Sequence, residues 1–188
     1  AGVAAPAAPQ LVVLTQQGYQ FSRSLLVVPR GTAVEFPNND NDYHNIFSLS
    51  RAKKFDAGRY KKNEAPAPVV TFDKAGFVRV QCEIHEHMKA AVLVVDSPWS
   101  TTTDAAGKFT LTGISPGSYT LRAQLDEKTQ WSAPVTITAR PAAAVTAAAP
   151  PAREGGCASS LGLLVHGLEH VEARRPQVLD AIDVDVQI

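Results

Sequence analysis

Short apolar runs separated by turn residues are the feature that most limits how this 188-residue chain can fold. Short β-branched and apolar runs bounded by Gly, Pro, Asn and Asp are typical of strands in an all-β sandwich. The runs expected to form strands in the first half of the chain are Leu11–Leu14, Leu25–Val28, Thr32–Phe36, Ile46–Leu49, Val69–Phe72, Phe77–Cys82 and Ala90–Val95.

One of these runs has a clear two-residue period. In Phe77–Cys82, Val78 and Val80 alternate with larger or charged residues. Because side chains in a strand point alternately to opposite faces, Cys82 is expected to share the core-facing side with the two valines. Residues 51–66 carry six lysines and arginines and are expected to form an irregular, solvent-facing connection.

A second β pattern follows Pro98. Its expected strands are Ser100–Thr103, Lys108–Leu111, Ser118–Ala123 and Pro134–Thr138, with Trp99, Phe109, Tyr119 and Trp131 as core residues. Residues 140–152 are mostly Ala and Pro and read as a linker, and Leu161–Ala173 is the one segment beyond it where a short helix is considered. The expected organisation is a flexible leader (residues 1–10), a first β domain (11–96), a small second β module (97–139) and a linker with an irregular tail (140–188).

Charge and composition exclude several function classes. The formal net charge is +0, and neither a nucleic-acid binder nor a polybasic membrane anchor is expected without a basic excess. No apolar run reaches the length of a transmembrane segment. The two cysteines, Cys82 and Cys157, are too few for a disulfide framework, although a single bridge between them is an alternative that would remove a free thiolate.

Soft and borderline metal donors gather in one short segment. Cys82, His85 and Met88 follow one another at intervals of three residues, and His44 lies in an upstream loop. One thiolate, two imidazoles and one thioether form the ligand set of a mononuclear copper electron-transfer site. His87 adds a second imidazole to the same segment, so His85 is the expected second histidine ligand and His87 is the alternative.

Several ordered motifs extend this pattern along the first domain. Residues 11–95 resemble the cupredoxins, especially their plastocyanin-like and amicyanin-like members. The motifs that carry the resemblance are Val34–Asp40, His44–Ser48, Phe55–Tyr60, Phe72–Gly76 and Cys82–Met88. The resemblance implies a Greek-key β-sandwich, one Cu(I)/Cu(II) ion, single-electron transfer between protein redox partners, and a periplasmic or otherwise exported protein.

The second module has a resemblance of its own. Residues 99–125 resemble the later part of a carboxypeptidase regulatory-like β module, through Thr103–Leu111 and Gly113–Leu121. The combination of these two modules resembles bacterial proteins of the methylamine-utilisation or plastocyanin-like type. No general base, nucleophile or substrate pocket is implied, so an electron carrier is expected here and not an enzyme.

Other functions remain as alternatives. The chain can be a cell-envelope binding or structural module whose metal site is structural or vestigial. Zinc shares the Cys and His donors but prefers a harder fourth ligand than a thioether. Asp40, Asp42 and His44 faintly suggest a calcium loop, but an ordinary Asx turn explains them better. His166, Glu169 and His170 match the H-x-x-E-H order of one zinc-protease class, a short match that chance also explains.

Overall fold

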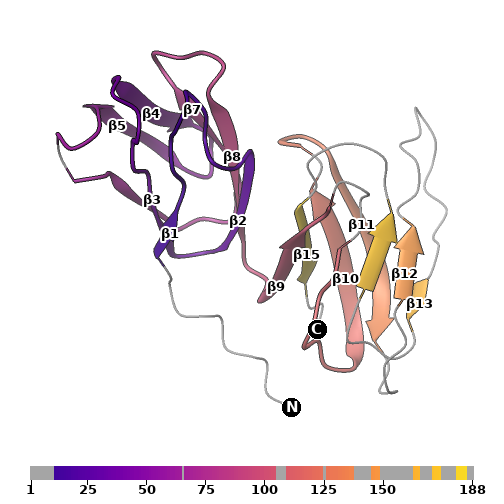
Figure 1. Ribbon diagram of the computed structural model, residues 1–188. Coiled ribbons are helices and arrows are strands. Elements are labelled where there is room, and N and C mark those ends of the chain that lie inside the picture. The colour runs from indigo at the N-terminus through magenta and orange to yellow at the C-terminus, as the bar shows by residue number, and fades with distance from the viewer. Residues whose placement is uncertain are drawn as a thin grey trace. The chain divides into compact units, whose positions relative to one another are not determined.

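The computed structural model describes residues 11–64, 66–104, 109–124 and 126–137, together with the backbone of four short strands further along the chain. All its described elements are strands, which confirms the all-β prediction (Figure 1). The chain divides into two compact units, with the boundary between Pro98 and Trp99. Within the described residues there is no helix with the length and apolarity to cross a membrane.

Two sheets make up the first unit. A three-stranded sheet has the order β1–β3–β6, and a five-stranded sheet has the order β2–β8–β7–β4–β5. The strands are β1 (Leu11–Val13), β2 (Leu25–Pro29), β3 (Thr32–Glu35), β4 (His44–Leu49), β5 (Lys54–Tyr60), β6 (Val69–Phe72), β7 (Gly76–Cys82) and β8 (Lys89–Val95). In this unit, the pairs β1–β3 and β2–β8 are parallel, and the pairs β3–β6, β4–β5, β4–β7 and β7–β8 are antiparallel.

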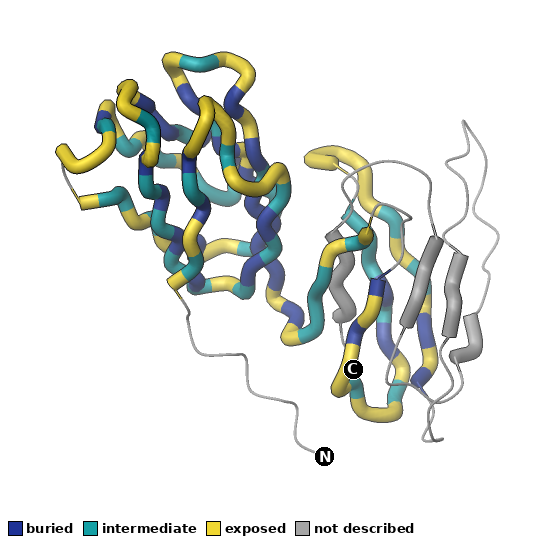
Figure 2. Tube along the Cα trace, viewed as in Figure 1, coloured by how far each residue is buried: buried dark blue, intermediate teal, exposed yellow. Residues whose placement is uncertain are grey.

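The two sheets bury one common core. Val34 and Phe72 from the smaller sheet lie in the same buried cluster as Val28, Val80 and Val92 from the larger one. Exposure alternates along β2, β3 and most of β7, as one-sided burial requires. Figure 2 shows these strands as alternating dark and light segments. The first unit is therefore a β-sandwich, and Cys82 is on the core side of β7, as the sequence predicted.

Strand β5 corrects one expectation. Residues 51–66 were expected to be an irregular connection, but Lys54–Tyr60 pairs antiparallel with β4, with a bulge between Asn45 and Phe47. Charged side chains on the outer face hide its period in the sequence. Phe55 and Ala57 pack against the core, and Tyr60 is buried, so the strand is held by its inner face.

The second unit is built on a long hairpin. Strands β10 (Gly117–Gln124) and β11 (Gln130–Ile137) pair antiparallel in a five-stranded sheet of order β13–β11–β10–β15–β9. The other strands are β9 (Trp99–Thr102), β13 (Leu163–Val165) and β15 (Ala181–Asp185), and β12 (Val145–Ala148) pairs with β14 (Val171–Arg174). As predicted, Phe109 and Tyr119 are buried in its core, with Trp99 and Trp131 packed against them.

Two further expectations for this unit differ from the structure. Phe109 and Leu111 are buried with Thr110 exposed, yet residues 109–111 form no strand, because the alternation alone supplies no ladder partner. Strands β13 and β14 occupy part of Leu161–Ala173, where a short helix was considered, and β15 extends the sheet within the tail expected to be irregular. Strand β15 pairs with both β10 and β9, so sheet partners distant in the sequence, and not a local period, decide its conformation. Cys157, His166, Glu169 and His170 lie outside the described residues.

Candidate metal centre

Three of the four expected ligands meet at one end of the first unit. His44, Cys82 and His85 each offer one ligand atom, and these atoms lie within 4.8 Å of one another. Cys82 Sγ lies 3.8 Å from His44 Nδ1 and 3.7 Å from His85 Nδ1. Cys82 is a free thiol and is buried, as is His44, while His85 is half-buried.

These spacings fit a single shared ion. Bonds of about 2.3 Å from a thiolate and about 2.0–2.1 Å from an imidazole, set roughly 120° apart, put sulfur and nitrogen about 3.8 Å apart. Both observed sulfur–nitrogen distances are close to that value. Direct Cys–His hydrogen bonds are weak at this distance, and the three side chains form a group that could hold one metal ion.

The strand ladder explains how distant residues meet. Ile46 in β4 pairs with Cys82 at the end of β7, which brings the start of β4 beside the thiol. His44 begins β4 and pairs with Tyr60 on its other side. Because both strands belong to one sheet, the position of His44 relative to Cys82 is fixed by backbone hydrogen bonds and not by a mobile loop.

The segment between β7 and β8 folds back on itself. Met88 N donates to His85 O at 2.9 Å, and Cys82 N donates to Met88 O at 3.2 Å. Met88 is among the most deeply buried side chains of the unit. The bond from Cys82 N to Met88 O brings the backbones of these two residues together, and Met88 as a weak fourth donor stays a prediction.

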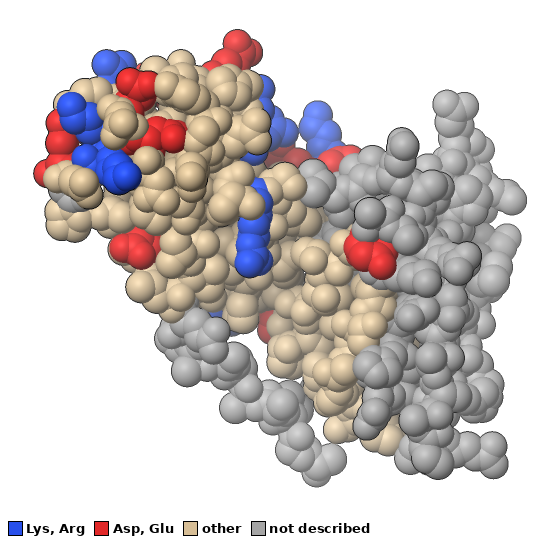
Figure 3. All heavy atoms as spheres, in the orientation of Figure 1, with Lys and Arg blue, Asp and Glu red and all other residues tan. Residues whose placement is uncertain are grey.

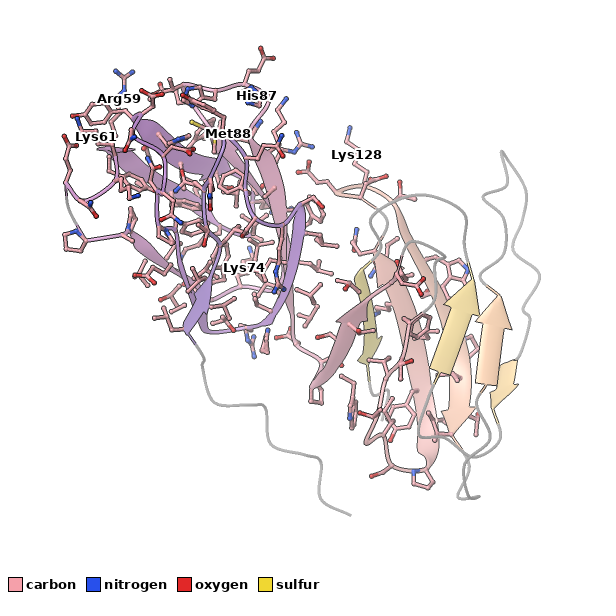
Figure 4. The ribbon with its side chains drawn as sticks, in the orientation of Figure 1. Arg59, Lys61, Lys74, His87, Met88 and Lys128 are labelled. Atoms are coloured by element: carbon pink, nitrogen blue, oxygen red, sulfur yellow. The ribbon has the colours of Figure 1, made fainter. Side chains whose placement is uncertain are left out.

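His85 and His87 occupy different environments. The His87 side chain is exposed, and its ring centroid lies 6.2 Å from that of His85. His85 belongs to the cluster with Cys82, and its ring centroid is 4.8 Å from that of His44. Figure 4 shows His87 and Met88 at the same end of the first unit as Arg59 and Lys61. The structure groups His85, the histidine that the sequence preferred, with His44 and Cys82, whereas His87 is not in this group.

A carboxylate stands behind the buried histidine. His44 Nε2 lies 3.2 Å from Asp40 Oδ2, although the two atoms are not aligned as a hydrogen bond and Nε2 is otherwise unpartnered. Burial, with His85 nearby, lowers the pKa of His44. Burial works against ionisation of Asp40, but N–H groups of Tyr19 and Gly18 and the nearby His44 outweigh it, so its pKa is lowered. A neutral His44 with a carboxylate behind it is the form that coordinates metal ions.

Side-chain links also join the two ligand-bearing segments. Asn45 Nδ2 donates to Glu83 Oε2 at 3.1 Å, and Glu83 N donates to Asn45 O at 2.9 Å. The side-chain bond ties the His44 segment to the Cys82 segment. Arg59 lies 3.7 Å from Glu83, so an acidic group of this segment faces a cation, and Figure 3 shows both signs of charge mixed over this unit.

Sequence reasoning missed the residues that surround the donors. Asp40 was expected only as part of an Asx turn, and its N–H does donate to Asn38 Oδ1 at 2.8 Å. Its carboxylate accepts backbone N–H groups, which is not the arrangement of a calcium loop. Tyr19 was not singled out, yet its ring contacts both imidazoles. No motif marks it, because it approaches from a turn 25 residues before His44.

Known proteins similar to this chain fall into two groups. Residues 75–150 match the family model of the carboxypeptidase regulatory-like domain. A copper-containing nitrite reductase from Thermus scotoductus SA-01 is 27% identical over 50% of this chain and 25% of its own, with a TM-score of 0.43. A reduced Cu(I) form of an amicyanin variant is 23% identical over 47% of this chain and 86% of its own, with a TM-score of 0.42.

Both expected resemblances are found. The amicyanin from Paracoccus versutus is a further similar structure, 21% identical over 49% of this chain and 86% of its own, with a TM-score of 0.41. The chain spans about a quarter of the length of the nitrite reductase. A comparison of this chain with curated proteins found no match. The regulatory-like match begins before β7, so it includes two strands of the first unit and extends further towards the N-terminus than the sequence resemblance did.

Proposed function

We propose that the first unit binds one copper ion through His44, Cys82, His85 and Met88 and carries single electrons between protein partners. The observation that supports this most strongly is the convergence of Cys82 Sγ and two imidazole nitrogens at 3.7–3.8 Å. A bound copper ion would supply one-electron Cu(I)/Cu(II) chemistry. The buried thioether of Met88 completes a donor set that suits copper better than zinc.

The protein's part in such a reaction is to hold its donors still. His44 and Cys82 lie on paired strands, and the Asn45–Glu83 bond links the segments that carry them. Donors fixed in this way change little between two oxidation states, which keeps the cost of each electron transfer small. With four protein donors no position is left for a substrate, so we propose a carrier and not an enzyme, acting in the periplasm or otherwise outside the cytoplasm.

The two cysteines provide a matched test. Purified protein loaded with Cu(II) is expected to show an intense visible thiolate-to-copper absorption band. Cys82→Ser is expected to abolish that band, because Cys82 lies with the two histidines, and the proposal expects Cys157→Ser to retain it. A colourless Cu(II) complex of the unaltered protein, or a band that survives Cys82→Ser, contradicts the proposal.

A cell-envelope binding or structural module is the second candidate. The observation in its favour is the regulatory-like match over residues 75–150, which no electron-transfer role requires. A redox titration of the copper-loaded protein separates the two candidates. A carrier cycles reversibly between Cu(I) and Cu(II), while a site that only stabilises the fold loses its metal or its spectrum during the cycle.

A further inference from the structure

A turn outside the ligand-bearing segments covers the candidate metal centre. Residues 17–20 form this turn, in which Gln17 N donates to Gln20 O at 2.9 Å. The ring centroid of Tyr19 lies 5.0 Å from that of His85, edge to face, and 6.0 Å from that of His44. Tyr19 is 40% exposed while His44 is fully buried, so the tyrosine ring lies on the solvent side of that imidazole.

This placement of Tyr19 costs free energy and is held by specific bonds. Its φ of 59° lies in the left-handed region, which a bulky side chain rarely adopts and which costs on the order of 1–3 kcal/mol. Asp40 accepts hydrogen bonds from Gly18 N at 2.7 Å and Tyr19 N at 3.0 Å, and the Tyr19 phenol donates to Asp42 Oδ2. Two carboxylates therefore fix one exposed ring over the histidines.

The same carboxylate reaches the ligand side of the site. Asp40 Oδ2, which accepts the Tyr19 N–H, is also the oxygen 3.2 Å from His44 Nε2. The turn and the imidazole beneath it are thus held by one side chain. A ring that needed only a place on the surface would not require a left-handed backbone anchored beside a metal ligand.

We propose that Tyr19 is a positioning residue that fixes the ring of His85 and keeps small anionic ligands away from the bound ion. The inference rests on the proposed copper-binding function and adds a role for a residue outside the ligand set. An edge-to-face contact restricts rotation of the half-buried His85 ring. With the ring of Tyr19 in place, the centre exchanges electrons without binding a substrate.

Tyr43 is a matched control for Tyr19. It is 43% exposed against 40% for Tyr19, and its phenol also donates to a carboxylate, Glu64 Oε1 at 2.6 Å. Its ring lies under Lys61, whose Nζ is 4.9 Å from the centroid. The two tyrosines therefore share exposure and bonding, and they differ in what their rings cover.

The first measurement needs no metal. In Tyr19→Gly the ring is removed at a backbone conformation that glycine adopts without strain, so folding is retained. Nuclear magnetic resonance of the metal-free protein is expected to show a shift of the His85 ring protons in Tyr19→Gly, through loss of the ring current, and none in Tyr43→Ala. Unchanged His85 resonances in Tyr19→Gly overturn the positioning role.

The second measurement titrates azide into the Cu(II)-loaded proteins and follows absorption and paramagnetic resonance. Azide is expected to alter the spectrum of Tyr19→Gly at a roughly tenfold lower concentration than that of the unaltered protein, Tyr43→Ala or Tyr19→Phe. Equal sensitivity of the unaltered protein and Tyr19→Gly overturns the shielding role, and so does a Tyr19→Phe variant as open as Tyr19→Gly. If the unaltered protein lacks the thiolate band, the proposed function itself fails, and the metal-free resonances still decide whether Tyr19 positions His85.

Discussion

The two units share one secondary structure but differ in what they bury. Among the described residues, the buried polar side chains all belong to the first unit: Gln16, Thr32, Asn38, His44, Asn45, Ser48, Ser50 and Ser97. The core of the second unit is an aromatic and aliphatic cluster built on Phe109, Tyr119 and Leu121. Burying polar groups opposes folding unless they are hydrogen-bonded, so the first unit carries a cost that is not seen in residues 99–104, 109–124 and 126–137 of the second.

That cost is concentrated around the candidate metal centre. In the described part of the chain, three buried side-chain atoms have no hydrogen-bond partner: Gln16 Oε1, His44 Nε2 and Asn45 Oδ1. Two of them belong to the segment that carries the first histidine donor. Gln16 is nearby in the same polar network, donating to Phe36 O at 3.1 Å and to Tyr60 OH at 2.7 Å. Burial of the large apolar core of the sandwich offsets the free-energy cost of burying these polar atoms beside the candidate metal centre.

Core truncation gives the largest expected effect and tests whether the units are independent. Phe36→Ala in the first unit should cost about 3–5 kcal/mol of unfolding free energy, and Leu121→Ala in the second about 2–5 kcal/mol, because both side chains are buried. The chain's only tryptophans, Trp99 and Trp131, lie in the second unit. Tryptophan fluorescence therefore follows the second unit alone, while far-ultraviolet circular dichroism follows both.

The expected result is selective. Phe36→Ala should lower the denaturation midpoint seen by circular dichroism and leave the fluorescence midpoint in place, and Leu121→Ala should lower the fluorescence midpoint. If either substitution moves both transitions equally, the two units unfold as one, and the contrast between their cores has no separate energetic meaning.

Metal addition should stabilise the first unit selectively, whereas core truncation destabilises one unit at a time. Binding to the folded state alone stabilises it by about 2.7 kcal/mol at a hundredfold excess over the dissociation constant and about 4.1 kcal/mol at a thousandfold excess. Copper is therefore expected to raise the unfolding transition of the first unit and leave the tryptophan transition unchanged. The matched control is Cys82→Ser, in which copper should give little stabilisation. Equal stabilisation of both transitions would place the metal elsewhere.

The sequence allowed much of the site to be predicted and less of its surroundings. Cys82, His85 and Met88 are close in the chain, and a two-residue period placed Cys82 on the core side of β7, so their proximity followed from local geometry. His44 was found through its motif. Asp40 and Tyr19 were missed, because their roles depend on a turn brought over the site by tertiary structure.

The strands show the same division. In runs such as Phe77–Cys82, the alternation of apolar residues predicts which face points to the core, and the structure confirms this prediction. Lys54–Tyr60 does not, because its outward charged residues dominate the pattern while pairing with β4 decides its conformation. In the second unit, Phe109 shows the reverse, since its burial was predicted while residues 109–111 do not form the expected strand. The local period of the sequence predicts which residues are buried, and pairing with other strands decides whether a segment forms a strand.

A comparison of one polar link in each unit gives the smallest expected effects. Asn45→Ala removes a part-buried bond to Glu83 and should cost roughly 1 kcal/mol of unfolding free energy in the metal-free first unit. It should also broaden the paramagnetic-resonance spectrum of the copper-loaded protein, because the side-chain link between the two ligand-bearing segments is lost and only their backbone bonds remain. An unchanged midpoint and spectrum would show that backbone pairing alone holds the donors.

The corresponding link in the second unit is exposed. Asp126 Oδ1 accepts hydrogen bonds from Lys128 N at 2.7 Å and Thr129 N at 2.9 Å in the turn between β10 and β11, and these bonds hold the pKa of Asp126 below its ordinary value of 3.8. A carboxylate with a lowered pKa stabilises the folded state above the pKa of the unfolded chain, and the contribution is lost as the pH falls through the folded pKa. Asp126→Ala should therefore lower the fluorescence midpoint slightly at neutral pH. The midpoints of the two proteins should become equal at a pH below the pKa of Asp126 in the folded state. A difference that persists at low pH would mean that the side chain acts through packing and not through its charge, which would make the second unit's turn more like the buried links of the first.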